Sequence, residues 1–186
     1  MIIGSGSTLD GRYELERRLG RGGFGEVFAA THVETRRPCA IKLLAARPET
    51  ADREDRLLRE AHLAAALVDD HITRVLDAGI HDGIPFVVME RLEGEDLGRR
   101  LERSGAFPPG PTALFSLHVA RALTAAHAHD IVHLDLKPRN MFLTWTADGR
   151  PLVKLLDFGT AKLLRHTSEE SSTLLAGTPV YMAPEQ

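Results

Sequence analysis

Two short segments of this sequence carry residue types that together suit the chemistry of phosphoryl transfer. Residues 133–140 read HLDLKPRN, and a DFG triplet follows at residues 157–159. An Asp can accept the proton of an attacking hydroxyl, a nearby Lys can neutralise a phosphoryl group, and an Asn with a second Asp can hold Mg²⁺. The candidate residues for this chemistry are Asp135, Lys137, Asn140 and Asp157.

The N-terminal third adds two patterns that suit phosphate binding. Residues 20–27 read GRGGFGEV, and residues 39–42 read CAIK. Glycines at this spacing also occur in dinucleotide-binding folds, but there they open a helix. Here apolar residues flank them with roughly the spacing of strands. This pattern predicts a hairpin tip whose backbone N–H groups approach phosphate oxygens, followed by a strand that carries Lys42.

These segments, together with GTPVYMAPE at residues 177–185, resemble the catalytic domain of serine/threonine protein kinases of the eukaryotic-like type found in bacteria. The resemblance runs from about residue 13 to residue 186. It implies an α+β, two-lobe fold like that of protein kinases. The implied parts are an N-terminal tail at 1–12, a strand-rich N-lobe with the hinge at 13–92, and a partial helical C-lobe at 93–186.

The resemblance implies transfer of the ATP γ-phosphoryl group, with the help of Mg²⁺, to Ser or Thr hydroxyls of protein substrates. Asp135 would accept or orient the hydroxyl proton, and Lys137 would neutralise the γ-phosphate. Lys42 would hold the α and β phosphates and pair with Glu60, although a solvent-facing role for Glu60 is the alternative. The implied Mg²⁺ ligands are Asn140 and Asp157.

The nucleotide-binding residues are implied in the same way. For the apolar ones among them, a plain role in core packing is the alternative. The implied residues are Leu19, Gly20, Gly22, Gly25, Val27, Ala40, Lys42, Met89 as gatekeeper, Glu90 and Leu92 in the hinge, Asp96 at a ribose hydroxyl, and Phe142.

Two positions bear on specificity and control. Lys137 together with Thr178 is typical of Ser/Thr kinases rather than tyrosine kinases. Leu134 stands where the family commonly has an Arg that pairs with a phosphorylated activation loop. We therefore expect activity to depend little on the hydroxyls at residues 167–173. A solvated loop with no regulatory role is the alternative for that segment.

Composition excludes several other classes of protein. The chain has 186 residues, 43% of them hydrophobic, and a formal charge of −3, so it lacks the basic field that nucleic-acid binding needs. Its single cysteine, Cys39, predicts a buried thiol in a cytoplasmic protein without an internal disulfide. The sequence shows neither a signal peptide nor an apolar run of membrane-spanning length. Oligomeric state, protein substrate and regulatory input are not indicated.

The family domain continues with several helices beyond the APE segment, so we expect this sequence to be a truncated kinase domain. Three hypotheses follow: a fragment of an active kinase, a nucleotide-binding pseudokinase or scaffold, and an inactive fragment. The complete set of motif residues disfavours the pseudokinase, and the missing helices disfavour activity of the isolated piece. The coding sequence after Gln186 would discriminate between them.

Hydrophobic periodicity and turn residues predict the elements that position these motifs. The expected elements are a helix at 52–67, strands at 72–76 and 85–90 joined by a turn at 81–83, a short helix opened by Asp96 and reaching Arg103, a long helix capped by Thr112 and ending near Asp130, and a hairpin of strands 141–145 and 151–156. The long helix is expected to present an apolar face of Leu114, Leu117, Val119, Ala120, Leu123 and Ala126.

Overall fold

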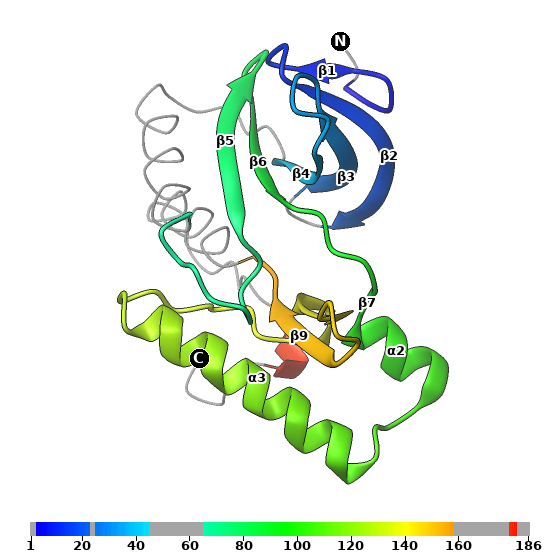
Figure 1. The fold of residues 1–186 in the computed structure, drawn as a ribbon, viewed down its shortest axis with the longest axis vertical. Helices are drawn as coiled ribbons and strands as arrows, with labels where there is room; N and C mark the ends of the chain where they lie inside the picture. The colour runs from blue at the N-terminus through cyan, green and yellow to red at the C-terminus, as the bar shows by residue number, and fades with distance from the viewer. Residues whose placement is uncertain (1–2, 23–24, 45–64, 158–178, 182–186) are drawn as a thin grey trace. The chain divides into compact units, whose positions relative to one another are not determined.

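The structure is a computed structural model that describes residues 3–22, 25–44, 65–157 and 179–181. The chain divides into two compact units. Unit 1 comprises residues 1–66 and 74–92, and unit 2 comprises residues 67–73 and 93–186. Unit 1 contains the strands drawn from blue to green in Figure 1, and unit 2 contains the green, yellow and orange helices and strands. The strand-rich first unit and the helix-containing second unit confirm the expected α+β class.

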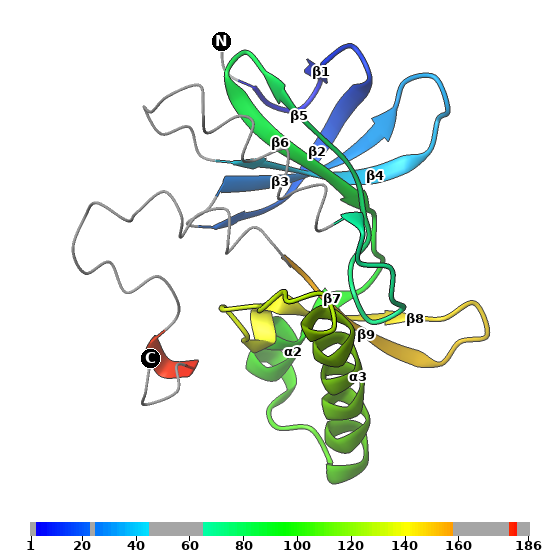
Figure 2. The same cartoon turned by 90° about the vertical axis from the view of Figure 1, so that its left-hand side faces the viewer.

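Six antiparallel strands form the sheet of unit 1, in the order β1-β2-β3-β4-β6-β5. The strands are β1 (Thr8–Leu9), β2 (Tyr13–Gly22), β3 (Gly25–His32), β4 (Pro38–Leu44), β5 (Val75–His81) and β6 (Ile84–Glu90). Figure 2 shows how strongly this sheet curls. The core of unit 1 contains Leu9, Tyr13, Leu15, Phe28, Ala30, Cys39, Ile41, Leu43, Phe86 and Val88. Cys39 is buried, as expected from its neighbours.

The segment expected to be an N-terminal tail contributes to this sheet. Thr8 and Leu9 pair with Glu14 and Tyr13 as strand β1. The side chain of Leu9 is fully buried in the core. Strand β1 was therefore not predicted, because Leu9 is its only apolar residue and a two-residue strand gives too short a pattern to reveal it.

The predicted strand at 72–76 was placed too early in the sequence. β5 begins at Val75 and ends at His81, where Asp82 and Gly83 connect it to β6. Both turn residues have positive φ, at 50° and 73°, as a two-residue hairpin requires, so the predicted turn is confirmed. Ile72 instead belongs to unit 2, where its side chain is buried. The residue that was expected to begin this strand thus lies in unit 2, whereas the strand itself belongs to unit 1.

Unit 2 combines a three-stranded antiparallel sheet, in the order β7-β8-β9, with two helices. Its elements are β7 (Glu95–Asp96), α2 (Leu97–Ser104), α3 (Pro109–His127), the 3₁₀ turn η1 (Pro138–Asn140), β8 (Met141–Trp145), β9 (Pro151–Leu155) and the 3₁₀ turn η2 (Pro179–Tyr181). The predicted hairpin at 141–156 is confirmed, with Gly149 at φ 77° in its turn. Helix α3 packs along β9, as Figures 1 and 2 show.

Helix α3 differs from its prediction at both ends and in its buried face. It begins at Pro109 rather than at Thr112, because a proline suits the first helical turn, where its missing N–H would have no partner. The Thr112 hydroxyl donates to the Pro108 carbonyl at 2.9 Å within the helix instead of capping it. The helix ends at His127 rather than near Asp130. The buried residues are Phe115, His118, Val119, Ala122 and Ala126, whereas Leu114, Leu117 and Ala120 are exposed.

Among the described residues, none of the helices has the length and apolar character that crossing a membrane requires.

Candidate active site

One face of the unit 1 sheet carries several residues expected around the nucleotide. The strand register places Val27 opposite Lys42, and Lys42 opposite Val87. Two residues along, Ala40 is opposite Met89. Directly paired residues, and residues two apart on one strand, point to the same face of a sheet. The alternate positions of these strands hold the core of unit 1, so the candidate nucleotide residues share the face opposite that core.

Lys42 is buried on this face, with 5% of its surface exposed. A buried ammonium group is costly unless it is paired with an acid. The predicted partner, Glu60, and most of the predicted helix at 52–67 lie outside the described residues. The Lys42–Glu60 pair therefore stays a prediction.

The glycine-rich segment forms the predicted hairpin tip, where Gly22 pairs with Gly25 and Gly20 pairs with Val27. Gly25 has φ +137°, and a Cβ atom built on it would lie 1.9 Å from the carbonyl oxygen of Leu43. The fold itself thus requires glycine at this position. Nothing among the described residues lies within 4 Å of a Cβ built on Gly20 or Gly22. Open space therefore adjoins these two glycines, and their contact with phosphates stays a prediction.

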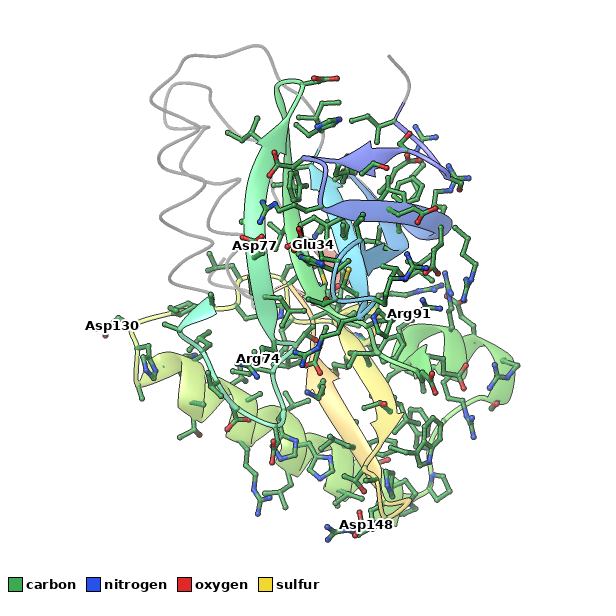
Figure 3. All side chains as sticks on the ribbon, turned by 45° about the horizontal axis from the view of Figure 1, so that its top comes forward. Glu34, Arg74, Asp77, Arg91, Asp130 and Asp148 are labelled. Carbon is green, nitrogen blue, oxygen red and sulfur yellow. The ribbon has the colours of Figure 1, made fainter. Side chains whose placement is uncertain are left out.

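The segment expected to be the hinge is anchored at Glu90. The backbone N–H of Glu90 donates to the carbonyl of Arg74 at 3.0 Å, and its side-chain carboxylate accepts the backbone N–H of Arg74 at 2.9 Å. Arg91 next to it forms an ion pair with Glu16 at 3.0 Å. Figure 3 labels Arg74 and Arg91 in this part of unit 1. The position of Glu90 is therefore fixed by paired contacts, so its own N–H is already in use.

Leu19 and Leu92 lie outside the regular strand register. Leu19 is half-buried in β2, at a register shift between Arg18 and Gly20. Leu92 follows β6 and is half-buried. Strand register does not fix which face either side chain occupies, so their contact with a nucleotide stays a prediction.

The catalytic-loop candidates meet in unit 2. The Nζ atom of Lys137 lies 2.7 Å from Oδ2 of Asp135. The side-chain amide of Asn140 donates to the same oxygen at 3.0 Å and to the Asp135 carbonyl at 2.8 Å. The Asn140 side chain projects from the 3₁₀ turn η1, and the residue is 8% exposed. Three residues that the sequence predicted to act together therefore form one hydrogen-bonded cluster.

His133 and Asn140 connect this cluster to the segment that carries Asp157. His133 is 2% exposed, its Nε2–H donates to the carbonyl of Leu156 at 2.9 Å, and its Nδ1 accepts the N–H of Asp135 at 3.3 Å. The N–H of Leu156 donates to the carbonyl of Asn140 at 2.9 Å. Burial lowers the pKa of His133, outweighing the opposite effects of the Leu156 bond and the charges of Asp157 and Asp135. A neutral imidazole suits this pattern of one donor and one acceptor.

Asp157, the last described residue before the activation segment, directly follows this doubly bonded Leu156. It adopts φ 64°, in the left-handed region that non-glycine residues seldom occupy. Asp157 therefore directly follows a residue whose backbone N–H and carbonyl are both bonded by the catalytic loop.

Asp96 and Phe142 lie opposite each other in the pairing of β7 with β8. Asp96 opens α2 as predicted, since its Oδ1 accepts the backbone N–H of Arg99 at 2.8 Å. The same carboxylate lies 3.6 Å from Arg139. The carboxylate already serves as a helix cap, and its contact with a ribose hydroxyl stays a prediction.

Arg139 and Gly98 were not among the predicted site residues. Arg139 bonds to Glu102 across the gap between the catalytic loop and α2. A Cβ built on Gly98 would lie 2.6 Å from Cδ of Arg139, so the absent side chain leaves room for the arginine. A glycine inside a short helix was the available signal, because glycine is costly there unless something packs against it.

Leu134, which stands in place of the family's arginine, also has a positive φ, at 65°. The activation-loop hydroxyls at 167–173 and Thr178 lie outside the described residues. Independence from loop phosphorylation therefore stays a prediction that rests on the chemistry of a leucine, which has no group to bind phosphate.

A buried lysine on a sheet face and an Asp–Lys–Asn cluster on a loop are the parts that phosphoryl transfer requires. The chain belongs to the protein kinase family, because the model of the protein kinase domain matches residues 13–186.

Relatives in sequence and in structure agree with this membership. The chain is 37% identical over 190 residues to the serine/threonine-protein kinase pkn2 of Myxococcus xanthus, covering 100% of this chain and 23% of that protein. It is 39% identical over 184 residues to PknH of Mycobacterium tuberculosis H37Rv, covering 96% and 28%.

Among solved structures, the chain resembles the PknI kinase domain of M. tuberculosis with a TM-score of 0.72 and 34% identity, covering 85% of this chain and 63% of that one. The kinase-like fold is thereby confirmed. The chain spans about a quarter of the length of the two curated relatives.

Proposed function

We propose that this chain is the catalytic core of a protein serine/threonine kinase, which transfers the γ-phosphoryl group of ATP to Ser or Thr hydroxyls of protein substrates with the help of Mg²⁺. The observation that carries the proposal is the cluster of Asp135, Lys137 and Asn140. It places a cation and an amide each within hydrogen-bonding distance of a carboxylate that can act as a base.

The contacts of Asp135 support different tasks for its two oxygens. Lys137 and Asn140 both approach Oδ2, at 2.7 and 3.0 Å. Of the described residues, none donates a hydrogen bond to Oδ1. Oδ1 is therefore the atom that would accept or orient the proton of the substrate hydroxyl, while Lys137 stands beside it to neutralise the transferred group. General-base help of this kind contributes about 10²- to 10⁴-fold to a rate.

The donor set also fits a Mg²⁺ ion. The amide nitrogen of Asn140 is engaged by Asp135, which leaves the amide oxygen as a metal ligand. Asp157 supplies a carboxylate, and oxygen donors of these two kinds are what Mg²⁺ prefers. When bound, the ion would neutralise charge that develops on the phosphates. In unit 1, Lys42 would hold the α and β phosphates below the tip that Gly20 and Gly22 leave open.

Selectivity and location are part of the same proposal. Lys137 with Thr178, and the printed names of the relatives, support Ser/Thr rather than Tyr specificity. ATP as the phosphoryl donor and the free buried thiol of Cys39 support a cytoplasmic location.

Paired substitutions test this function. Nucleotide binding is measured on the 186-residue chain by calorimetry, and transfer is measured with labelled ATP on the complete product of the gene. Lys42→Met should weaken Mg·ATP binding, while Arg37→Met, on the exposed loop before β4, should not. Asp157→Asn should abolish most transfer, while Asp148→Asn, at the exposed hairpin labelled in Figure 3, should leave it unchanged. Wild-type transfer by Lys42→Met or Asp157→Asn would refute the assignment.

A further inference from the structure

Strand β9 has one edge that does not pair with β8, and this edge is nevertheless closed by hydrogen bonds. The N–H of Val153 donates to Nδ1 of His118, and Nδ1–H of His71 donates to the carbonyl of Val153, both at 3.2 Å. Two residues along, Leu155 donates to the carbonyl of His71 at 2.8 Å and accepts from the N–H of Thr73 at 2.9 Å. Two imidazoles thus take the place that a neighbouring strand would have at Val153.

The two imidazole rings form one stacked pair. Their centroids lie 4.4 Å apart with 24° between the ring planes, and His71 and His118 are 8% and 7% exposed. The direction of each hydrogen bond fixes which ring nitrogen of each histidine carries the proton. His71 carries its proton on Nδ1, because a carbonyl can only accept. His118 accepts at Nδ1, so its proton lies on Nε2 and the ring is neutral while the bond exists.

Protonation of His118 would remove this arrangement. An imidazolium donates at both nitrogens, so it cannot accept the N–H of Val153, and it would place a charge against the stacked ring of His71. Burial lowers the pKa of His118, and His71 and Arg121 lower it further. Charged residues on the segments that carry the pair include Asp69 and Asp70 before Ile72, Arg121 on α3 and Lys154 on β9, and Asp69 accepts the backbone N–H of His71.

The strand held by this pair leads directly to the proposed Mg²⁺ ligand. Leu155, whose N–H bonds to His71, is followed by Leu156, and the backbone of Leu156 is bonded by Asn140 and His133. Asp157 comes next. The two residues directly before Asp157 are thus both fixed by hydrogen bonds, Leu155 by the segment at His71 and Leu156 by the catalytic loop.

We propose that His71 and His118 are positioning residues for Asp157, which fix the edge of β9 through Val153 and do so only while His118 is neutral. The proposal rests on the proposed function for the role of Asp157 and on the hydrogen-bond geometry for everything else. The low-pH form of His118 releases the edge of β9, and Mg²⁺-dependent binding of ATP weakens with it.

Three variants distinguish the bond made by His118, the bond made by His71 and the effect of protonating His118. In His118→Asn the amide oxygen takes the place of Nδ1, so the bond to Val153 is kept and no longer titrates. His118→Phe and His71→Phe each keep a ring in the stack but remove one bond to Val153. His129→Asn is the matched control. His129 is exposed just beyond the end of α3, and among the described residues its side chain bonds only to the carbonyl of Ala125.

The first readout is the protection factor of the Val153 amide against hydrogen exchange, measured by NMR between about pH 8 and about pH 4.5, a range that spans the ordinary histidine pKa of about 6.5. In the wild type and His129→Asn it should fall about tenfold or more as pH decreases, because a buried N–H loses its acceptor. In His118→Asn it should stay constant, and in His118→Phe it should be low throughout. A wild-type value that does not change with pH, or an equal fall in His118→Asn, would overturn the proposal.

The second readout is the Mg²⁺ concentration that half-saturates ATP binding at about pH 7.5, well above the ordinary pKa of histidine. It should rise severalfold in His118→Phe and His71→Phe and return to the wild-type value in His118→Asn. Equal values in all variants would show that the pair does not position Asp157. If the wild type binds no Mg·ATP at all, the proposed function fails, and the exchange of Val153 still decides whether the pair controls β9.

Discussion

Substitution of two glycines in the same hairpin tip should have opposite consequences. Gly25→Ala should destabilise unit 1, whereas Gly22→Ala should leave its stability nearly unchanged and weaken ATP binding. The two residues pair with each other across the tip, so they differ little in location. They differ in what a methyl group would meet.

The magnitude follows from the backbone at each site. Gly25 has φ +137°, and its added Cβ would lie 1.9 Å from the Leu43 carbonyl oxygen, on the strand with which Gly25 pairs. A non-glycine residue held in such a conformation costs about 1 to 3 kcal/mol. Moving the Leu43 carbonyl adds about 1 kcal/mol for a weakened hydrogen bond. We expect Gly25→Ala to lower the free energy of unfolding by about 2 to 4 kcal/mol in total.

Gly22 has an ordinary backbone conformation, and nothing lies within 4 Å of its added Cβ among the described residues. Replacing glycine by alanine at such a site changes stability by less than about 1 kcal/mol. The methyl group would instead occupy the space through which phosphates approach the backbone, raising the Kd for Mg·ATP by about tenfold, or 1.4 kcal/mol.

Urea unfolding followed by far-UV circular dichroism measures the first effect, and calorimetric titration with Mg·ATP measures the second. Equal loss of stability in the two variants would refute the distinction between a glycine required by the fold and one required by the ligand. So would undiminished ATP affinity in Gly22→Ala.

Substitutions at three other positions, Tyr13, Leu134 and Glu90, probe further features of the two units. Tyr13→Phe removes a 2.6 Å bond to Asp77 and should cost about 1 to 3 kcal/mol in urea unfolding. Burial raises the pKa of Asp77, but the bonds from Tyr13 and Ala78 and the charge of Arg12 outweigh it and leave that pKa below its usual value. The associated stability is present above about pH 3.9 and lost as pH falls through the folded-state pKa, so acid unfolding of Tyr13→Phe should depend less on pH. At Leu134, with φ 65°, Leu134→Val should unfold about 1 kcal/mol more easily than Leu134→Asn, because a β-branched residue tolerates this conformation worst; equal stabilities would contradict this. Glu90→Ala should raise the Kd for ATP about threefold to tenfold by freeing Arg74, while Glu90→Gln keeps an acceptor and stays near wild type; identical affinities would remove the anchoring role of Glu90.

Turns and helix caps depend on residues that are close together in the sequence, so these parts of the fold could be predicted from sequence patterns. The glycine-rich tip and the turn at Gly149 each require a conformation that few residues adopt, so the β2–β3 and β8–β9 hairpins could be predicted from sequence. Asp96 was recognisable as a helix cap because its short side chain carries an oxygen that can accept an N–H of the first helical turn. The start of α3 was missed because Thr112 resembles a cap, although the preceding Pro109 already suits the first turn.

In the candidate site, too, contacts between residues close in sequence could be predicted, and contacts between distant residues could not. Asp135, Lys137 and Asn140 are close in sequence and meet on one loop, so their cluster was predictable. His71 and His118 are distant in sequence and bond to a backbone group of a third segment, which no pattern of residue types encodes. The contact of Arg139 with Glu102 likewise depends on how α2 packs beside the catalytic loop.

The most direct test of the central claim is the transfer of the labelled γ-phosphoryl group of ATP by the complete gene product and by its Asp135→Asn variant. We predict Mg²⁺-dependent label on Ser or Thr of a protein substrate, with a rate about 10²-fold or more lower in the variant, because Asn140 and Lys137 leave Oδ1 of Asp135 to receive the proton. Transfer at the wild-type rate by Asp135→Asn, or label confined to Tyr, would contradict the account.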